Sequence, residues 1–224
     1  MYEELKRICD SIATTPGIRV AVFRGAGDKA FVSGSDIQQF VDLQEDEAYE
    51  VAVDAIFHSL QHLPIPTIAL IEGLAVGSGL LIATACDFRI STVDARFGIP
   101  VAKTLGNCLS PSNLSWIANH LGVPMVKRML LTAELIKAPE LLASGYLYQT
   151  ASPEEIVAVT EVLANKLAVL APITQKASKV TLARLLESNL PDCTELMRET
   201  YNSVDFKEGV NAFLEGRSPK WIGK

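Results

Sequence analysis

Two short glycine-containing turns hold the residues of this chain whose types and spacing could do chemistry. Residues 33–36 (SGSD) and 77–79 (GSG) each follow an apolar run that predicts a buried strand. Ligands of open α/β sheets bind where strands end, and the second turn opens a helix, whose first N–H groups lack intrahelical partners. If the two turns converge, the N–H groups of Ser35 and Ser78 would both donate to one oxygen atom and form an oxyanion hole.

Each turn taken alone has a simpler interpretation, because a tight turn without a ligand is the commoner role of such residues. The Gly-Ser-Gly stretch is too short for a dinucleotide-binding fingerprint, and the chain has no phosphate-binding GxxxxGK(S/T) loop. Only the combination of the two turns points to catalysis. It does so through backbone atoms rather than through an acid, a base or a nucleophile.

The turns need a scaffold, and the hydrophobic pattern predicts one. Apolar, β-branched runs indicate buried strands at residues 18–23, 67–72 and 88–91. Helical periodicity, broken by proline and glycine, indicates helices at residues 2–13, 45–62 and 78–86. Strands and helices that alternate in this way form parallel sheets with crossover helices, so the predicted fold class is α/β.

After residue 111 the pattern is mostly helical. It predicts helices at residues 113–120, 124–132, 139–144 and 153–170, the last capped by Ser152, and two or three more that end near Glu215. We therefore expect an α/β core over residues 1–150 and a helical region over residues 151–224. The three histidines lie on or at the ends of predicted helices, and we interpret all of them as helix-surface or helix-end residues: His58, His62 and His120.

The composition excludes several classes of protein. The 224 residues carry a formal net charge of -6 and are 49% hydrophobic, which is typical of a folded protein and unfavourable for binding nucleic acid. No run of about 18 apolar residues is present, so no membrane partner is expected, and the N-terminus predicts an amphipathic helix rather than a signal peptide. The four cysteines form no CxxC pair and predict reduced thiols, a cytoplasmic location and no metal site.

Five blocks of sequence carry a family resemblance. They are KAFVSGSDI from residue 29, IPTIALIEGLAVGSG from 65, CDFRISTVDARFGIP from 86, ELLASGYLYQTAS from 140 and GVNAFLEGRSPKW from 209. In this order and spacing they resemble the enoyl-CoA hydratase/isomerase (crotonase) superfamily. The resemblance implies a spiral core of ββα repeats, a helical C-terminal trimerisation region, and a homotrimer or a hexamer built as a dimer of trimers. The family's usual N-terminal β-hairpin would precede Met1, so we expect it to be absent.

The resemblance also implies the ligand, an acyl-CoA thioester, so that coenzyme A enters as part of the substrate and no tightly bound cofactor is expected. The family's thioester oxygen accepts two backbone N–H bonds, whose donors map to Ser35 and Ser78. Lys29 matches a lysine that meets CoA phosphate, although an ordinary exposed lysine is an equal alternative. Ser33 matches a position whose carbonyl meets adenine. The residues expected to contact the CoA part are Lys29, Ser33, Gly34 and Gly77.

The sequence departs from the family at both positions that usually carry a catalytic glutamate. These positions hold Leu81, two residues after the second turn, and Val101, after the proline of the FGIP block. Hydration of an enoyl-CoA needs a base to activate water and an acid to protonate the α-carbon, and neither side chain can do this. Two-glutamate hydration is therefore unsupported, and isomerisation through the second glutamate is disfavoured too.

Three residues are candidates to replace the glutamates. In some relatives an aspartate works a few residues further along, near Asn107 or Cys108 here. Cys108 would be a nucleophile if a helix N-terminus lowered its pKa, but a small buried hydrophobe is the more common role. Asn107 is more simply a cap or turn residue. Asp36 abuts the first turn and is the first alternative if a carboxylate is required.

The sequence as a whole predicts an acyl-CoA-binding crotonase-family enzyme of the hydratase/isomerase type. Its enolate would be held in the backbone oxyanion hole. The alternatives are a non-catalytic acyl-CoA-binding family member, a different crotonase reaction such as that of a hydrolase or a dehalogenase, and a structural subunit of a mixed trimer. The oxyanion-hole hypothesis predicts that the amide nitrogens of Ser35 and Ser78 both point into one pocket.

Overall fold

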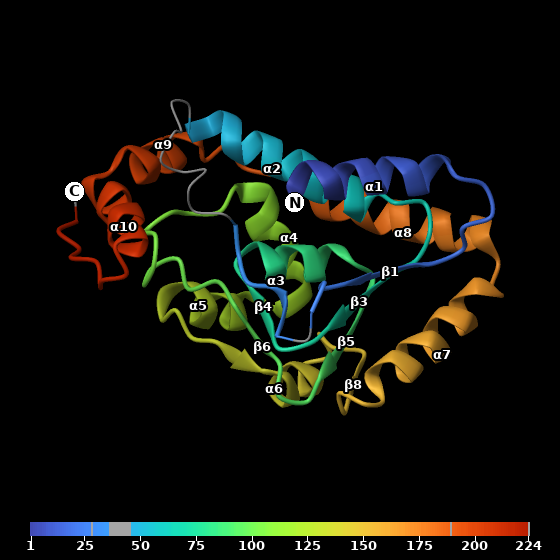
Figure 1. Ribbon diagram of the computed structural model, residues 1–224. Coiled ribbons are helices and arrows are strands. Elements are labelled where there is room, and N and C mark those ends of the chain that lie inside the picture. The colour runs from blue at the N-terminus through green and yellow to red at the C-terminus, as the bar shows by residue number, and fades with distance from the viewer. Residues whose placement is uncertain (28, 36–45, 189, 224) are drawn as a thin grey trace.

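The computed structural model describes residues 1–27, 29–35, 46–188 and 190–223, which contain two four-stranded sheets (Figure 1). The strands are β1 (Ala21–Arg24), β2 (Ala30–Val32), β3 (Thr67–Ile71), β4 (Leu74–Val76), β5 (Phe88–Thr92), β6 (Arg96–Gly98), β7 (Ile136–Lys137) and β8 (Gln149–Ala151). The first sheet has the order β1–β3–β5–β8, and its neighbours run parallel. The second has the order β2–β4–β6–β7, and its β6–β7 pair is antiparallel.

Helices pack around these sheets over the same described residues. They are α1 (Tyr2–Thr14), α2 (Asp46–Gln61), α3 (Ser78–Ala85), α4 (Pro111–Leu121), α5 (Val123–Leu131), α6 (Ala138–Ala143), α7 (Ile156–Ala168), α8 (Pro172–Glu187), α9 (Thr194–Asn202) and α10 (Val204–Leu214). Among the described helices, none alone has the length and apolar character to cross a membrane. The pair α7 and α8, bent by 104°, meets that test by length and composition only.

The chain passes from one sheet to the other and back. β1, β3 and β5 belong to the first sheet, and the strand that follows each belongs to the second. Between β3 and β4 the chain turns at Gly73, where φ is +66° and an added Cβ would lie 2.1 Å from the carbonyl oxygen of Lys29. Only glycine fits there. Because a helix then returns the chain to the first sheet, the repeat is strand, strand, helix, and the expected ββα spiral is confirmed.

The central helix α3 is buried along its whole length. All eight of its residues are buried, and it packs against β2, β4, α2 and α4 (Figure 1). Such a helix needs apolar side chains on every side, which Leu80 and Ile82 help to supply. The apolar run after the second turn therefore fixes the N-terminus of α3 in the interior of the molecule.

Three sequence-based expectations need correction. The strands β2, β4 and β6, together with β7 and β8, were missed, because runs of two or three residues are too short to show strand alternation. The helix expected from residue 153 begins at Ile156, after a turn. Ser152 does not cap it, since its hydroxyl donates to the Glu155 carboxylate instead of accepting from a helix N–H.

The helical C-terminal region is anchored on the first sheet. Ile156 and Leu163 of α7 pack with Ile68, Leu70 and Ile90 from β3 and β5. This apolar contact explains why the pattern of α7 carries a buried face. The division of the chain at residue 151 stays a prediction.

A partly buried ion pair joins α8 to the same sheet. Lys179, whose side chain is 10% exposed, donates to Asp87 Oδ2 at 2.7 Å and to the Ile65 carbonyl at 3.0 Å. Asp87 also accepts from the backbone N–H of Thr67 at 2.7 Å. One carboxylate therefore holds both the start of β3 and the middle of α8.

Replacing Asp87 by alanine is expected to lower the free energy of unfolding by about 2–3 kcal/mol, because it leaves a largely buried ammonium group and the Thr67 N–H without their shared partner. Urea denaturation of the wild type and the variant measures this difference. Asp94 is exposed, and Asp94→Ala is the matched control, with an expected change within about 0.5 kcal/mol. A change below about 1 kcal/mol in Asp87→Ala would contradict the structural role of the ion pair.

Candidate active site

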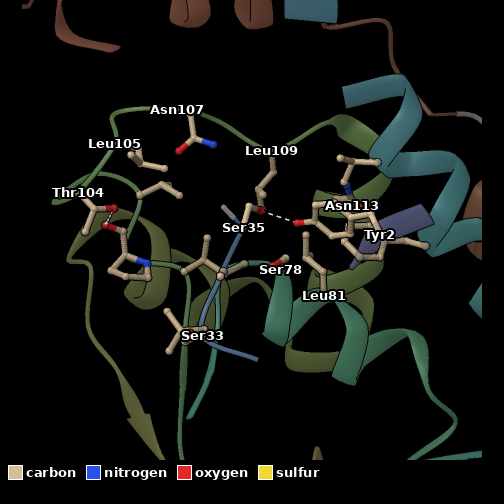
Figure 2. A pocket seen from close by; sticks show the side chains of 18 of the residues that line it. Tyr2, Ser33, Ser35, Ser78, Leu81, Thr104, Leu105, Asn107, Leu109 and Asn113 are labelled. Carbon is tan, nitrogen blue, oxygen red and sulfur yellow. Dashed lines mark hydrogen bonds between the residues drawn. The ribbon is translucent and has the colours of Figure 1, made fainter. Parts of the chain in front are cut away.

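The two glycine-containing turns line one cavity of about 160 Å³ (Figure 2). Residues 33–35 follow β2, and Gly77 and Ser78 open α3. A Cβ added to Gly77 would lie 3.7 Å from the Cα of Gly34, so the turns are direct neighbours. The expected convergence of the turns is thus present. The aim of both N–H groups at a single oxygen atom stays a prediction.

Glycine makes this close approach feasible at three positions. Gly34 and Gly77 have φ values of +125° and +59°, which side-chain-bearing residues rarely adopt. A Cβ on Gly79 would lie 2.0 Å from the Val32 carbonyl oxygen, so α3 packs on β2 only because this residue is glycine. Glycine is therefore required at these three positions by the backbone conformation or by the close packing of α3 on β2.

Ser78 is the first residue of α3, and Gly77 precedes it as the N-cap without a side-chain cap bond. The N–H groups of a first helical turn have no carbonyl earlier in the helix to bond, and the helix dipole is positive there. The N-terminus of α3 therefore presents donors and positive potential to the cavity, which suits an oxygen atom that gains negative charge.

Two buried side-chain oxygens in the cavity wall lack a hydrogen-bond partner among the described residues. They are Ser78 Oγ and Asn107 Oδ1, and Ser78 as a residue is only 7% exposed. A buried polar atom without a partner costs about 1–3 kcal/mol. Unpaired groups of this kind mark places where a ligand or water supplies the missing bond.

Tyr2 reaches the cavity from the first turn of α1. Its hydroxyl is hydrogen-bonded to the Ser35 hydroxyl, as Figure 2 shows, and its ring packs edge-on against Phe57 of α2. Nothing in the sequence pattern pointed to Tyr2. The interaction appears only once α1 is packed beside α2 and the first turn.

Among the described residues that line the cavity, Tyr2 is the only one with an ionisable side chain. Leu81 and Val101, which the family resemblance maps to the usual glutamate positions, both line the cavity, and Leu81 is 6% exposed. The remaining described lining is hydroxyl, amide, glycine or apolar: Ser33, Gly34, Ser35, Gly77, Ser78, Thr104, Asn107, Asn113, Val53, Phe57, Val76, Ile99, Pro100, Leu105, Leu109 and Phe213. The lining therefore provides hydrogen bonds and apolar contact, but no carboxylate and no imidazole.

Asp54 of α2 does not line the cavity but is hydrogen-bonded to the lining residue Asn113. Its Oδ1 accepts from Ser110 Oγ at 2.7 Å and from Asn113 Nδ2 at 2.6 Å, and Ser110 in turn caps α4 by accepting from the Asn113 N–H. Burial raises the pKa of Asp54, and the hydrogen bonds from Ser110 and Asn113 oppose that shift. Asp54 positions Asn113, which is a lining residue, and the sequence alone did not single it out.

The C-terminal helix α10 contributes one residue to the wall of the cavity. Phe213 of α10 is a lining residue, and the ring of Trp221 packs on Gly106, where an added Cβ would lie 3.2 Å from it. The closing block of the sequence, from residue 209, therefore supplies a lining residue of the cavity. Phe213 itself was not predicted.

The other candidate residues lie elsewhere. Cys108 packs with the cluster formed by Leu105, Tyr201, Phe206 and Val210 and does not line the cavity, so the geometry gives the nucleophile hypothesis no support. Lys29 is exposed just before β2, and its contact with CoA phosphate stays a prediction. Asp36 lies outside the described residues.

A spiral of ββα repeats that opens two glycine turns onto one cavity is the crotonase type of fold, and solved structures of that type match with TM-scores up to 0.91. The whole chain, residues 1–224, matches the family model described as enoyl-CoA hydratase/isomerase. The chain belongs to the enoyl-CoA hydratase/isomerase family.

Individual relatives are moderately similar. The chain is 29% identical to the short-chain-enoyl-CoA hydratase of Clostridium acetobutylicum over 96% of this chain and 84% of that protein. It is 32% identical to the (E)-benzylidenesuccinyl-CoA hydratase of Thauera aromatica over 98% of this chain and 88% of that protein. A solved methylmalonyl-CoA decarboxylase in complex with 2-nitronate-propionyl-CoA has a TM-score of 0.91 at 27% identity, covering 100% of this chain and 88% of that one.

Proposed function

We propose that this acyl-CoA enzyme binds the carbonyl oxygen of a CoA thioester between the N–H groups of Ser35 and Ser78 and stabilises the enolate that forms from it. The observation that carries the proposal is the meeting of the two glycine turns on one cavity. Each backbone donor of this kind contributes roughly 3 kcal/mol of transition-state stabilisation. The unpaired oxygens of Ser78 and Asn107 supply further hydrogen-bonding positions beside the bound acyl group.

The reaction is not two-carboxylate hydration. Leu81 and Val101 occupy the positions from which an acid and a base would act, and the described lining offers no substitute carboxylate. Tyr2, hydrogen-bonded to Ser35, is the side chain able to pass a proton to or from the substrate. This chemistry fits a reaction that forms the enolate without a strong base.

Decarboxylation of a 2-carboxyacyl-CoA is the second candidate function, favoured by the absence of carboxylates in the described lining. The bond between the α-carbon and the carboxylate breaks, carbon dioxide leaves, and the bonding electron pair forms the enolate, whose oxygen the two N–H groups hold. A proton from Tyr2 or water then completes the α-carbon. The step needs no base, and the fold similarity to methylmalonyl-CoA decarboxylase supports it.

The first experiment combines an assay with a binding titration. Crotonyl-CoA and longer enoyl-CoAs are incubated with the protein while the absorbance of the conjugated thioester is followed, and acetyl-CoA binding is titrated alongside. Binding of acetyl-CoA with enoyl-CoA turnover at background is the expected result. Hydration well above background would contradict the proposed chemistry, and no binding of any CoA ester would contradict the proposed site.

Methylmalonyl-CoA and malonyl-CoA separate the remaining functions. Release of carbon dioxide from either would support decarboxylation. Binding of CoA esters without turnover of any of them would support the non-catalytic acyl-CoA-binding alternative. A trimer or hexamer stays a prediction from the family resemblance. Exposed apolar side chains on α7 and α8 would suit such an interface: Val162, Ile173, Leu182 and Leu185.

A further inference from the structure

We propose that His58, His62 and Glu187 form a binding site for a divalent transition-metal ion of the zinc class, which ties the end of α8 to the end of α2. One ligand atom from each residue lies within 4.8 Å of the others. Two imidazoles and one carboxylate are ligands that zinc accepts, with further positions left for water. This site lies apart from the acyl-CoA cavity and does not depend on the proposed reaction.

The distances suit a single small cation. His62 Nε2 lies 3.3 Å from Glu187 Oε2, and His58 Nε2 lies 3.7 Å from Glu187 Oε1. Zinc bonds of about 2.0–2.1 Å put neighbouring ligand atoms of a tetrahedral site about 3.3 Å apart. The Glu187 carboxylate therefore already lies at about ligand spacing from both imidazole nitrogens.

The hydrogen bond from His62 Nδ1 to the His58 carbonyl leaves the lone pair of His62 Nε2 free to bind a metal. Nδ1 of His62 lies 3.1 Å from the backbone carbonyl oxygen of His58, and because a carbonyl only accepts, Nδ1 carries the proton. In the neutral ring Nε2 then presents a lone pair to the Glu187 carboxylate, which is also an acceptor. A cation between them removes this repulsion. Metal-binding histidines commonly donate their second ring N–H to a backbone carbonyl in this way.

The two imidazole rings are stacked, and because an Nε2 lone pair lies in its ring plane, one ring has to turn about its side-chain torsions before both can bind one ion. Their centroids lie 3.8 Å apart with an interplanar angle of 22°, one helical turn apart at the end of α2. Two protonated rings stacked this closely would repel each other, whereas one divalent ion serves both neutral rings and the carboxylate together.

The surrounding backbone also favours a cation. His58 lies in the last turn of α2, His62 follows its last residue, and Glu187 is the last residue of α8. The C-terminal ends of α2 and α8 therefore lie beside each other at this cluster (Figure 1). Each helix C-terminus carries about half a negative charge, which attracts a cation. The His58 side chain is 60% exposed, so an ion can enter from solvent. A bound ion would fix α8 against α2, whose Val53 and Phe57 line the acyl-CoA cavity.

The test uses the full chain without a histidine tag, stripped with EDTA and titrated with zinc chloride by calorimetry. One ion per chain is expected, with a melting temperature that rises with zinc concentration. His62→Ala and Glu187→Gln should each weaken binding by at least about 10-fold. Glu154, an exposed glutamate elsewhere, provides the matched control, and Glu154→Gln should leave zinc binding unchanged.

Cobalt(II) spectra distinguish this site from the cysteines. Binding at nitrogen and oxygen ligands gives weak visible bands without the intense near-ultraviolet absorption of a cobalt–thiolate bond. Two results would overturn the proposal. One is the absence of one-to-one zinc binding in the wild type, which would leave only a protonation-dependent ion pair. The other is unchanged zinc affinity in the double variant His62→Ala/Glu187→Gln.

Discussion

Ser78→Pro is expected to lower the turnover number for the CoA ester that the wild type processes by about 100- to 1000-fold, because it removes one oxyanion-hole donor. Ser78 is the first residue of α3, with Gly77 as the N-cap. Proline is favoured at this position, since the missing N–H has no role in the helix. The substitution therefore deletes the proposed donor while the helix is retained.

Ser78→Ala is the matched variant, because it removes the side-chain hydroxyl and keeps the backbone N–H. The hydroxyl oxygen is buried without a partner among the described residues, so its loss is not expected to destabilise the fold. We expect Ser78→Ala to retain at least about 10-fold more activity than Ser78→Pro. Equal activities in the two variants would place the oxyanion elsewhere.

The infrared spectrum of a bound thioester gives a readout that needs no turnover. Hydrogen bonds weaken the carbonyl bond of acetyl-CoA labelled with carbon-13 at the carbonyl carbon, so its stretching frequency should fall on binding to the wild type and to Ser78→Ala. In Ser78→Pro the frequency should move back toward that of free acetyl-CoA. An unchanged frequency in the wild type would mean that the carbonyl does not lie between the two turns.

The sequence predicted those elements of the fold that a local run of apolar residues is enough to identify. β3 and β5 are runs of five residues that are almost entirely buried, so their apolar sequence alone located them to within a residue. β2, β4 and β6 have three residues each, and their existence depends on pairing with one another. No local pattern reports such pairing, although the glycine between β3 and β4 marks the place where the chain changes sheets.

The candidate site likewise has a part that the sequence predicts and a part that it does not. The glycine turns could be predicted, because the backbone requires glycine at Gly34, Gly77 and Gly79 through φ or close approach. Tyr2 and Phe213 come from opposite ends of the chain and reach the cavity only through packing of α1 and α10. Their types and neighbours in the sequence match those of ordinary core aromatics, so no sequence pattern could have placed them there.

Glutamate at both family positions is expected to create enoyl-CoA hydration. In the double variant Leu81→Glu/Val101→Glu, crotonyl-CoA hydration should rise at least about 100-fold above the wild-type background, because positioned acid–base groups each contribute about 10²–10⁴-fold. Both positions face the cavity that holds the proposed oxyanion hole. Loss of the conjugated-thioester absorbance measures the rate.

The environment of position 81 also suits the role of an acid. Leu81 is 6% exposed in a largely apolar wall, so burial should raise the pKa of a glutamate placed there and keep more of it protonated near neutral pH. The same burial should lower the melting temperature of the variant, since a polar group replaces an apolar one. A melting curve is therefore recorded with each assay.

Leu81→Gln/Val101→Gln is the matched control, because glutamine has nearly the shape of glutamate but cannot transfer a proton. It should show no hydration above the wild type. Failure of the glutamate variant to hydrate crotonyl-CoA, while it stays folded and still binds acetyl-CoA, would contradict the proposed substrate position. In that case the acyl group would not lie between positions 81 and 101. Success would mean that this cavity already holds the thioester as hydratases require and that the two apolar side chains alone direct it to other chemistry.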